Sequence, residues 1–238
     1  MTVLTTATIK RISSLSEKKF RNSTGLFVVE GEKMVREALD SDFDVLEVYR
    51  REDIGDKAME RISSLSTPSP VLAVVRQKQY PMPDISNGLF LALDSVRDPG
   101  NLGTIIRLSD WFGVNAIFVS EDTVELYNPK VVQATMGAIF RKKVIRCSIP
   151  ELCDAFRRAG RKVYGTFLNG SDIYRQELDS DGLIVMGNES EGISAPVAGK
   201  VTDSLLIPDF AGGSPTAESL NVAIATAITL SEFKRKTY

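Results

Sequence analysis

The sequence predicts an α/β protein with two domains, a small N-terminal α/β domain over residues 1–82 and a larger α/β domain over residues 88–238. Three observations support this prediction. Apolar runs typical of strands alternate with helical patterns, which in the larger domain favours a mostly parallel sheet with helices on both faces. Two prolines in the polar stretch at residues 77–84 indicate a linker. The length of 238 residues and the hydrophobic content of 43% suffice for two cores.

The N-terminal domain is predicted to contain three strands and one clear helix. The strand-like runs are residues 26–30, 45–49 and 71–75. Residues 31–40 place Met34, Val35 and Ala38 on one face, which indicates an amphipathic helix. Residues 61–66 are predicted to form a turn, and we place the domain boundary near residues 80–87.

The C-terminal domain is predicted to contain six strands and four helices. The strands are expected at 89–93, 116–119, 143–147, 162–165, 182–187 and 204–207, and the helices at about 101–112, 129–138, 149–159 and 219–234. The last helix is the best defined, because Leu220, Ile224 and Ile228 recur every four residues with Ala223 and Ala227 beside them. This stripe fits packing in the core or against a second subunit, and the pattern alone favours neither.

The composition excludes several classes of chemistry. The chain has no histidine, so Ser-His-Asp and Cys-His catalysis are excluded. Cys147 and Cys153 fit no common zinc spacing, so we expect free thiols and no metal site. No apolar run reaches the roughly 18 residues needed to cross a bilayer, and the first residues lack the pattern of a signal peptide. We therefore expect a cytoplasmic protein that does not contact a membrane.

The net charge of −2 does not by itself indicate a nucleic-acid-binding protein, but the basic residues are unevenly distributed. They gather in three clusters, which are Lys10, Arg11, Lys18, Lys19 and Arg21, then Arg141, Lys142, Lys143 and Arg146, and finally Lys234, Arg235 and Lys236. Each cluster alone fits an ordinary solvated surface. The three together are compatible with a basic groove that binds phosphates.

Three polar segments that follow apolar runs hold the candidate functional residues. In the first, a turn that contains Asn101 leads into a helix that carries Arg107. The second is the glycine-bounded stretch 187–192, and the third joins residues 207–208 to residues 219–221. Ligands of open α/β sheets bind where strand ends meet helix starts, so the three segments are predicted to form one site. Each also has a purely structural interpretation, as a tight turn or as the cap of a helix.

The order and spacing of these segments resemble the three motifs of the SpoU (TrmH-like) RNA ribose 2′-O-methyltransferases, a branch of the knotted SPOUT superfamily. Asn101 and Arg107 match the pattern N-x-G-x-x-x-R, and residues 187–192 match G-x-E-x-x-G. The third segment matches I-P followed by S-L-N. The resemblance covers roughly residues 88–235 and implies a catalytic domain with a C-terminal trefoil knot. It further implies a homodimer whose active site takes residues from both subunits, with S-adenosylmethionine as the cofactor.

The resemblance also assigns roles to individual residues. It implies that the catalytic residues are Arg107, Asn101, Glu189, Ser219 and Asn221, and that the cofactor contacts are Thr166, Gly187, Ile207 and Leu220. In similar proteins the arginine contacts RNA or takes part in deprotonating the ribose 2′-hydroxyl. We favour stabilisation of the developing alkoxide, because a guanidinium has a pKa above about 12 and rarely loses its proton.

Two positions depart from the pattern of the family. The loop from Asp209 to Glu218 is longer than usual, which leaves open how the methionine end of the cofactor is held. Gln133 stands where many relatives carry an arginine, which weakens one RNA contact. Neither departure affects the residues assigned to catalysis.

The N-terminal stretch around Lys19-Phe-Arg21 resembles the substrate-binding domain that precedes the catalytic domain in many relatives and is similar to small RNA-binding ribosomal proteins. The predicted RNA contacts are Lys18, Lys19, Arg21 and Arg141. The expected function is methyl transfer from S-adenosylmethionine to a ribose 2′-hydroxyl of ribosomal or transfer RNA, without a metal. The alternative is a non-catalytic RNA-binding or ribosome-assembly protein on the same fold. A small-molecule α/β enzyme is disfavoured, because the chain has no glycine-rich dinucleotide or phosphate loop.

Overall fold

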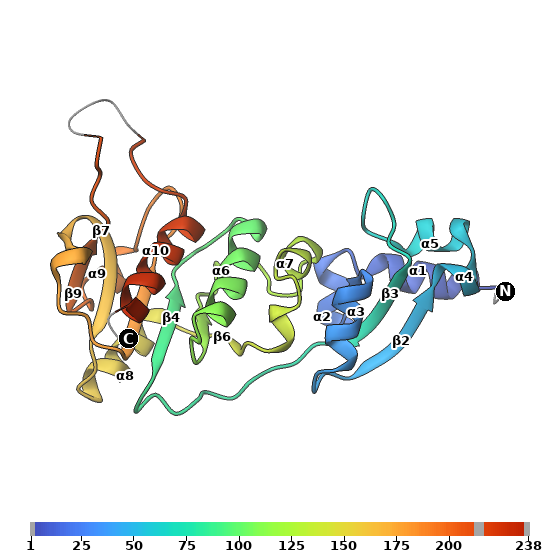
Figure 1. Cartoon of the computed structure of the whole chain (residues 1–238). Helices are drawn as coiled ribbons and strands as arrows, with labels where there is room; N and C mark the ends of the chain where they lie inside the picture. The colour runs from blue at the N-terminus through green and yellow to red at the C-terminus, as the bar shows by residue number, and fades with distance from the viewer. Residues whose placement is uncertain (1–2, 212–216, 236–238) are drawn as a thin grey trace. The chain divides into compact units, whose positions relative to one another are not determined.

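The computed structural model describes residues 3–211 and 217–235, and in them the chain forms two compact units. Unit 1 combines the N-terminal residues up to Gln79 with residues 125–141. Unit 2 combines residues 80–124 with the chain from Lys142 onward. Strands and helices alternate in both units (Figure 1), so the predicted α/β class is confirmed.

Unit 1 is built on an antiparallel sheet of three strands in the order β1-β3-β2. The strands are β1 (Leu26–Glu30), β2 (Val45–Arg50) and β3 (Val71–Arg76). One face of the sheet packs on α1 (Thr6–Ser14) and α5 (Asp56–Ile62), and the other on α3 (Glu32–Leu39) and α7 (Pro129–Ala134). Two further helices are α2 (Lys18–Thr24) and α4 (Arg51–Ile54). The turn predicted at 61–66 is wrong at its start, because α5 continues to Ile62.

Residues 125–141 complete the core of unit 1. The buried side chains of Tyr127, Val132, Ile139 and Phe140 pack in one cluster with Phe27. The cluster includes the short 3-10 helix η1 (Ala138–Phe140), where the sequence analysis expected the end of one long helix. Burial of these apolar side chains, and not their position in the sequence, joins the segment to unit 1.

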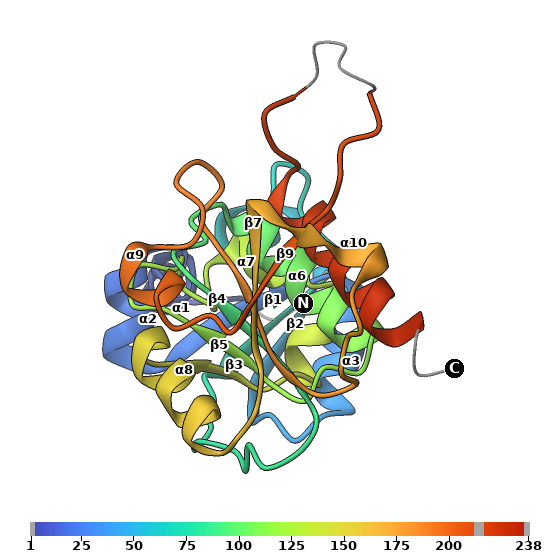
Figure 2. The ribbon, with the colours of Figure 1, turned by 90° about the vertical axis from the view of Figure 1, so that its left-hand side faces the viewer.

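Unit 2 contains a parallel sheet of six strands in the order β6-β5-β4-β8-β7-β9. The strands are β4 (Leu89–Leu93), β5 (Ile117–Val119), β6 (Val144–Arg146), β7 (Val163–Asp172), β8 (Gly182–Met186) and β9 (Asp203–Leu206). The helices are α6 (Pro99–Trp111), α8 (Ile149–Arg158), the 3-10 helix η2 (Ile173–Arg175), α9 (Ala195–Ala198) and α10 (Val222–Arg235). Figure 2 shows α8 and α9 on one side of the sheet and α6 and α10 on the other. The parallel sheet with two helical layers is therefore confirmed, and the trefoil knot stays a prediction.

The apolar stripe of the last helix lies mostly at the surface. Leu220, which precedes α10, is 49% exposed and Ile224 is 53% exposed, whereas Ala223 beside them is buried together with Leu230 and Phe233. The helix packs against α6. Of the two uses left open for the stripe, packing in the core of the same chain holds for Ala223 but not for Leu220 and Ile224.

The sequence analysis expected no membrane-spanning helix, no metal site and two free thiols. No helix in the described part of the chain is long and apolar enough to span a membrane, and no group of three or more potential ligand side chains there could hold a metal ion. Cys147 and Cys153 are free thiols, as predicted. Burial raises the pKa of both thiols to about 11, so they stay protonated near neutral pH.

Candidate active site

A cavity of about 410 Å³ lies in unit 2, beside β7 and at the carboxyl ends of β8 and β9. Its wall is formed by residues 166–168, 186–193, 206–207 and 218–220, together with Val222 and Ala225 of α10. The four predicted cofactor contacts, which are Thr166, Gly187, Ile207 and Leu220, all lie in this wall. Residues 212–216 of the long loop 209–218 lie outside the described residues.

The turn after β8 is so tight that only glycine fits at its first position. A Cβ atom on Gly187 would lie 2.2 Å from the carbonyl carbon of Gly192 and 2.3 Å from the backbone nitrogen of Ile193. The turn is closed by two backbone hydrogen bonds between Asn188 and Gly192, of 2.9 and 3.0 Å. The sequence pattern at 187–192 therefore encodes a fixed wall of the cavity.

Gly187→Ala is expected to weaken ligand binding to the cavity by at least about tenfold, because the new methyl group must displace backbone atoms and cannot be accommodated by a side-chain rotation. Isothermal titration calorimetry with S-adenosylmethionine measures the loss. The matched control is Gly199→Ala, where a Cβ would meet nothing nearer than 3.7 Å. Equal affinity of the two variants would contradict this role of Gly187.

The three predicted motifs meet in one chain of hydrogen bonds. The Asn101 amide nitrogen donates to Glu189 Oε1 over 2.9 Å. The Asn221 amide nitrogen in turn donates to Asn101 Oδ1 over 2.9 Å. The structure thus links one residue from each motif, although these residues are 88 and 120 positions apart in the sequence.

Glu189 sits against the start of α6. Its carboxylate also accepts longer hydrogen bonds from the backbone N–H groups of Arg97 and Asp98, of 3.4 and 3.3 Å. It does not cap the helix that follows it, because α9 begins only at Ala195, with Ser194 in the capping position. The purely structural interpretation of Glu189 as the cap of that helix is therefore wrong.

These contacts set the charge of Glu189. Burial raises the pKa of this carboxyl, but the hydrogen bonds from Asn101 and from the backbone outweigh burial and hold the pKa below its usual value. Glu189 is therefore ionised near neutral pH. Its contribution to stability is present above the usual pKa of a glutamate and is lost as the pH falls through the lowered pKa.

Two polar residues that were not predicted from the sequence connect the loop after β4 to the loop after β8 by hydrogen bonds. Asp94 is buried directly after β4 and accepts a hydrogen bond of 2.8 Å from the backbone N–H of Ser194. Asn188 donates a hydrogen bond of 2.7 Å to the carbonyl of Ser95. A polar residue that ends an apolar strand is the only sequence signal that marks Asp94.

The remaining catalytic candidates, Arg107 and Ser219, lie in different places. Ser219 is in the cavity wall, but the cap of α10 is Asn221, whose Oδ1 accepts hydrogen bonds from the backbone of Ala223 and Ile224. Arg107 is exposed on α6 and does not line the cavity. Within the described residues, its side chain makes no hydrogen bond or ion pair, so the guanidinium is available to a ligand or to another chain.

The predicted RNA contacts also separate. Lys18 and Lys19 are exposed at the start of α2. Arg21 is only 2% exposed and forms a bidentate ion pair with Glu125, so its prediction as a phosphate contact is wrong. Arg141 is partly exposed and forms an ion pair with Glu37. Lys236, in the third basic cluster, lies outside the described residues.

Two family models and a curated relative match this chain. The family model of the SpoU rRNA Methylase family matches residues 88–231, and that of the MRM3-like substrate binding domain matches residues 6–54. The chain is 31% identical over 236 residues to RlmP, a 23S rRNA guanosine 2′-O-methyltransferase of Bacillus subtilis, with 92% of this chain and 93% of the relative covered.

Solved structures agree with this similarity. An AdoMet-bound rRNA methyltransferase from Sinorhizobium meliloti superimposes with a TM-score of 0.89 at 30% identity, covering 100% of this chain and 98% of the other. A TrmH-family protein from Porphyromonas gingivalis gives a TM-score of 0.87 at 37% identity, covering 98% and 99% of the two chains. Both superpositions include the two units of the chain.

Proposed function

The chain belongs to the SpoU rRNA methylase family, and from this membership we propose that it transfers the methyl group of S-adenosylmethionine to a ribose 2′-hydroxyl of ribosomal or transfer RNA. One observation carries the proposal most directly. The hydrogen-bonded chain from Glu189 through Asn101 to Asn221 joins all three family motifs beside the cavity. A relative with bound AdoMet supports the choice of cofactor.

The cavity fits this cofactor. Its volume of about 410 Å³ lies within the usual range for small-molecule sites. Met186, Leu206 and Leu220 give it apolar surface for a purine ring, and the carboxylates of Glu191 and Glu218 favour a ligand that carries ammonium and sulfonium charges. When bound there, the cofactor supplies a methyl group already activated by the sulfonium.

The side chains of the site then have to position the ribose and stabilise charge. The 2′-hydroxyl has to give up its proton to solvent as its oxygen is methylated, which gives that oxygen the character of an alkoxide, and a fixed cation beside it would lower the barrier. We assign this task to Arg107, while Glu189 and Asn221 hold Asn101 in place. No metal takes part in this mechanism.

We further propose that the active form is a homodimer. Trp111 is 85% exposed at the end of α6. Leu220, which precedes α10, and Ile224, in the first turn of α10, are also exposed, and α10 packs on α6. Leu220 and Ile224, four residues apart in the sequence, are exposed apolar side chains of the kind that forms contact surfaces. Arg107 lies one turn before Trp111 on the exposed side of α6, and we propose that the partner subunit receives this Arg107 at its own active site.

Ile224→Asp is expected to convert the dimer into a monomer and to abolish methyl transfer, because it places a carboxylate in an apolar contact. Light scattering after size-exclusion chromatography measures the mass. Leu39→Asp is the matched control, since Leu39 is also 53% exposed but lies in unit 1. A wild-type chain that runs as a monomer, or an Ile224→Asp variant that stays dimeric, would contradict the proposed interface.

The remaining roles follow the two family models. We propose that residues 1–82 bind the RNA substrate and that residues 88–238 carry out methyl transfer, with Lys18 and Lys19 as phosphate contacts. We also propose a cytoplasmic location, where ribosomal and transfer RNA are available. The match of the MRM3-like substrate binding domain to residues 6–54 supports the first of these assignments.

The cofactor half of the proposal has a direct test. Calorimetric titration should detect binding of S-adenosylmethionine to the wild-type chain. A Leu220→Trp variant, which fills the cavity wall with an indole, should abolish that binding. Absence of binding in the wild type, both alone and with total RNA present, would instead favour a non-catalytic RNA-binding protein.

A further inference from the structure

Two segments far apart in the sequence meet at the edge strand of unit 1. Strand β1 lies at one edge of the three-stranded sheet, and both α2 and α7 pack against it. Helix α2 and the chain leading into α7 are joined by the ion pair of Arg21 and Glu125, whose residues are 104 positions apart.

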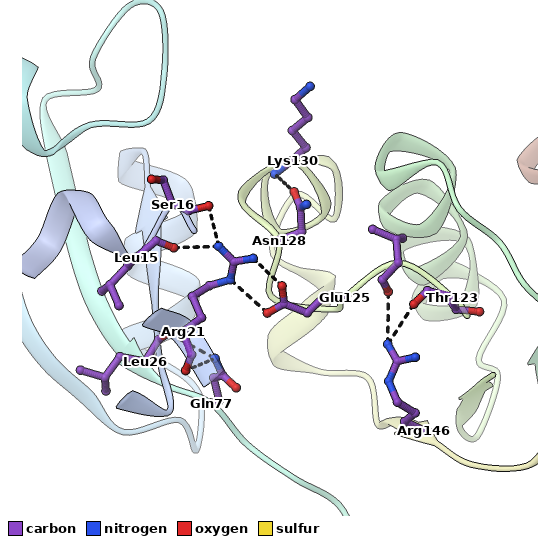
Figure 3. Close-up of polar contacts among 11 residues, drawn as sticks. Leu15, Ser16, Arg21, Leu26, Gln77, Thr123, Glu125, Asn128, Lys130 and Arg146 are labelled. Atoms are coloured by element: carbon purple, nitrogen blue, oxygen red, sulfur yellow. Dashed lines mark hydrogen bonds and ion pairs between the residues drawn. The ribbon is translucent and has the colours of Figure 1, made fainter. Parts of the chain in front are cut away.

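Arg21 fixes this junction with most of its donors (Figure 3). Its Nε donates to Glu125 Oε1 over 3.0 Å, and Nη2 donates to Oε2. Its Nη1 donates to the carbonyls of Leu15 and Ser16, over 2.8 and 2.7 Å. A buried guanidinium with four hydrogen bonds leaves the start of α2 little freedom to move relative to residue 125.

Lys130 lies in the first turn of α7, on the side of the junction that carries Glu125. Asn128 caps α7 by accepting a hydrogen bond of 2.9 Å from the backbone N–H of Lys130, which orients the first turn of the helix. Figure 3 shows the Lys130 side chain extending away from the buried pair, near which Ser16 also lies. Within the described residues, the ammonium group makes no hydrogen bond or ion pair, and the side chain is exposed.

The charges at this junction have a net positive balance. Arg21 and Glu125 neutralise each other. Lys18, Lys19 and Lys130 are all exposed, and the nearby carboxylate in the connection before α2 is Glu17, which lies 3.7 Å from the Lys19 ammonium. Exposed lysines without tight partners are suited to phosphates, because they release counterions when an RNA backbone binds.

We propose that Lys18, Lys19 and Lys130 form one binding patch for RNA phosphates, assembled by the Arg21–Glu125 ion pair. The proposal rests on the proposed action on RNA and adds to it a contact residue outside the N-terminal domain. Lys130 belongs to the stretch matched by the methylase family model, yet its segment packs in unit 1. Arg21 thereby acts as a positioning residue, and the phosphate contact predicted for it passes to Lys130.

The test measures binding of an unmodified ribosomal RNA transcript over a series of salt concentrations. Lys130→Ala and Lys18→Ala are each expected to lower the affinity and to reduce the slope of log K against log salt by about 0.7–0.9. Lys57→Ala, which removes an exposed lysine of unit 1 on α5, is the matched control and should change neither quantity. Lys130→Arg should retain wild-type binding, since the charge is kept.

The outcomes separate this proposal from the function itself. A wild-type chain that methylates RNA, with a Lys130→Ala variant whose affinity and salt slope equal those of Lys57→Ala, would overturn the patch alone. A wild-type chain that neither binds nor methylates the transcript would overturn the proposed function and the patch with it. Binding of S-adenosylmethionine should be unchanged in all four variants.

Discussion

Arg107→Ala is expected to lower kcat by about 100- to 1000-fold while leaving the affinity for S-adenosylmethionine unchanged. The guanidinium lies outside the cavity wall, so its removal leaves the cofactor contacts intact. Its proposed task is to stabilise charge on the 2′-oxygen, and that charge develops only in the transition state. Single-turnover kinetics with saturating RNA, together with calorimetry, measure the two quantities separately.

The matched control is Arg158→Ala, which removes an exposed arginine of α8 in the same unit and should retain full turnover. Near-normal turnover of Arg107→Ala would remove Arg107 from the mechanism. The proposed exchange of Arg107 between subunits adds a sharper experiment. A mixture of Arg107→Ala and Gly187→Ala chains should regain activity, because a mixed dimer contains one intact cavity served by one intact arginine. Failure to regain activity would show that Arg107 acts within its own subunit.

Arg21→Ala is expected to lower the free energy of unfolding by about 3–5 kcal/mol, the usual cost of breaking a buried ion pair on one side. The substitution leaves the Glu125 carboxylate, which is only 15% exposed, without its partner. It also leaves the carbonyls of Leu15 and Ser16 without their donor. Chemical denaturation followed by circular dichroism measures the loss.

Arg36→Ala provides the comparison, because Arg36 is an exposed arginine of α3 in the same unit. That change should stay within about 0.5 kcal/mol, as is usual for surface substitutions. A loss below about 1 kcal/mol for Arg21→Ala would mean that solvent or a neighbouring group satisfies Glu125, and the junction would not be held by this pair.

The local pattern of apolar residues was sufficient to predict several strands of the two sheets. The strand predicted at 89–93 agrees with β4, and the runs at 71–75 and 182–187 differ from β3 and β8 by a single residue at one end. These strands are buried along nearly their whole length, so their apolar runs are continuous and easily recognised. Helices α1 and α2 were not predicted, because their few apolar residues stand among lysines, arginines and serines.

Long-range packing explains what the pattern missed in unit 1. The stretch Lys18-Lys19-Phe20-Arg21 has the composition of a solvated basic surface, and only the approach of Glu125 shows that Arg21 is buried. The same holds for residues 125–141, whose apolar side chains fit a core in either unit. No local rule states which partner they pack against.

For the candidate site, the sequence identified residues but not the contacts between them. Glycines and polar residues after strands, matched to the family motifs, identified Gly187, Asn101 and Glu189 without a structure. The hydrogen bonds that connect Asn101, Glu189 and Asn221 could not be derived from spacing, because they depend on how β4, β8 and α10 meet. The hydrogen bond between Asp94 and Ser194 could not be derived from the sequence for the same reason.

The measurement that tests the central claim most directly is transfer of a labelled methyl group from S-adenosylmethionine to unmodified ribosomal or transfer RNA. The RNA is digested after the reaction, and the labelled nucleoside is identified by mass spectrometry and by its resistance to alkaline cleavage, which a 2′-O-methyl group confers. The proposed mechanism predicts label on a ribose 2′-oxygen with the wild-type chain and almost none with Arg107→Ala. Label on a base, or no label although both cofactor and RNA bind, would contradict it.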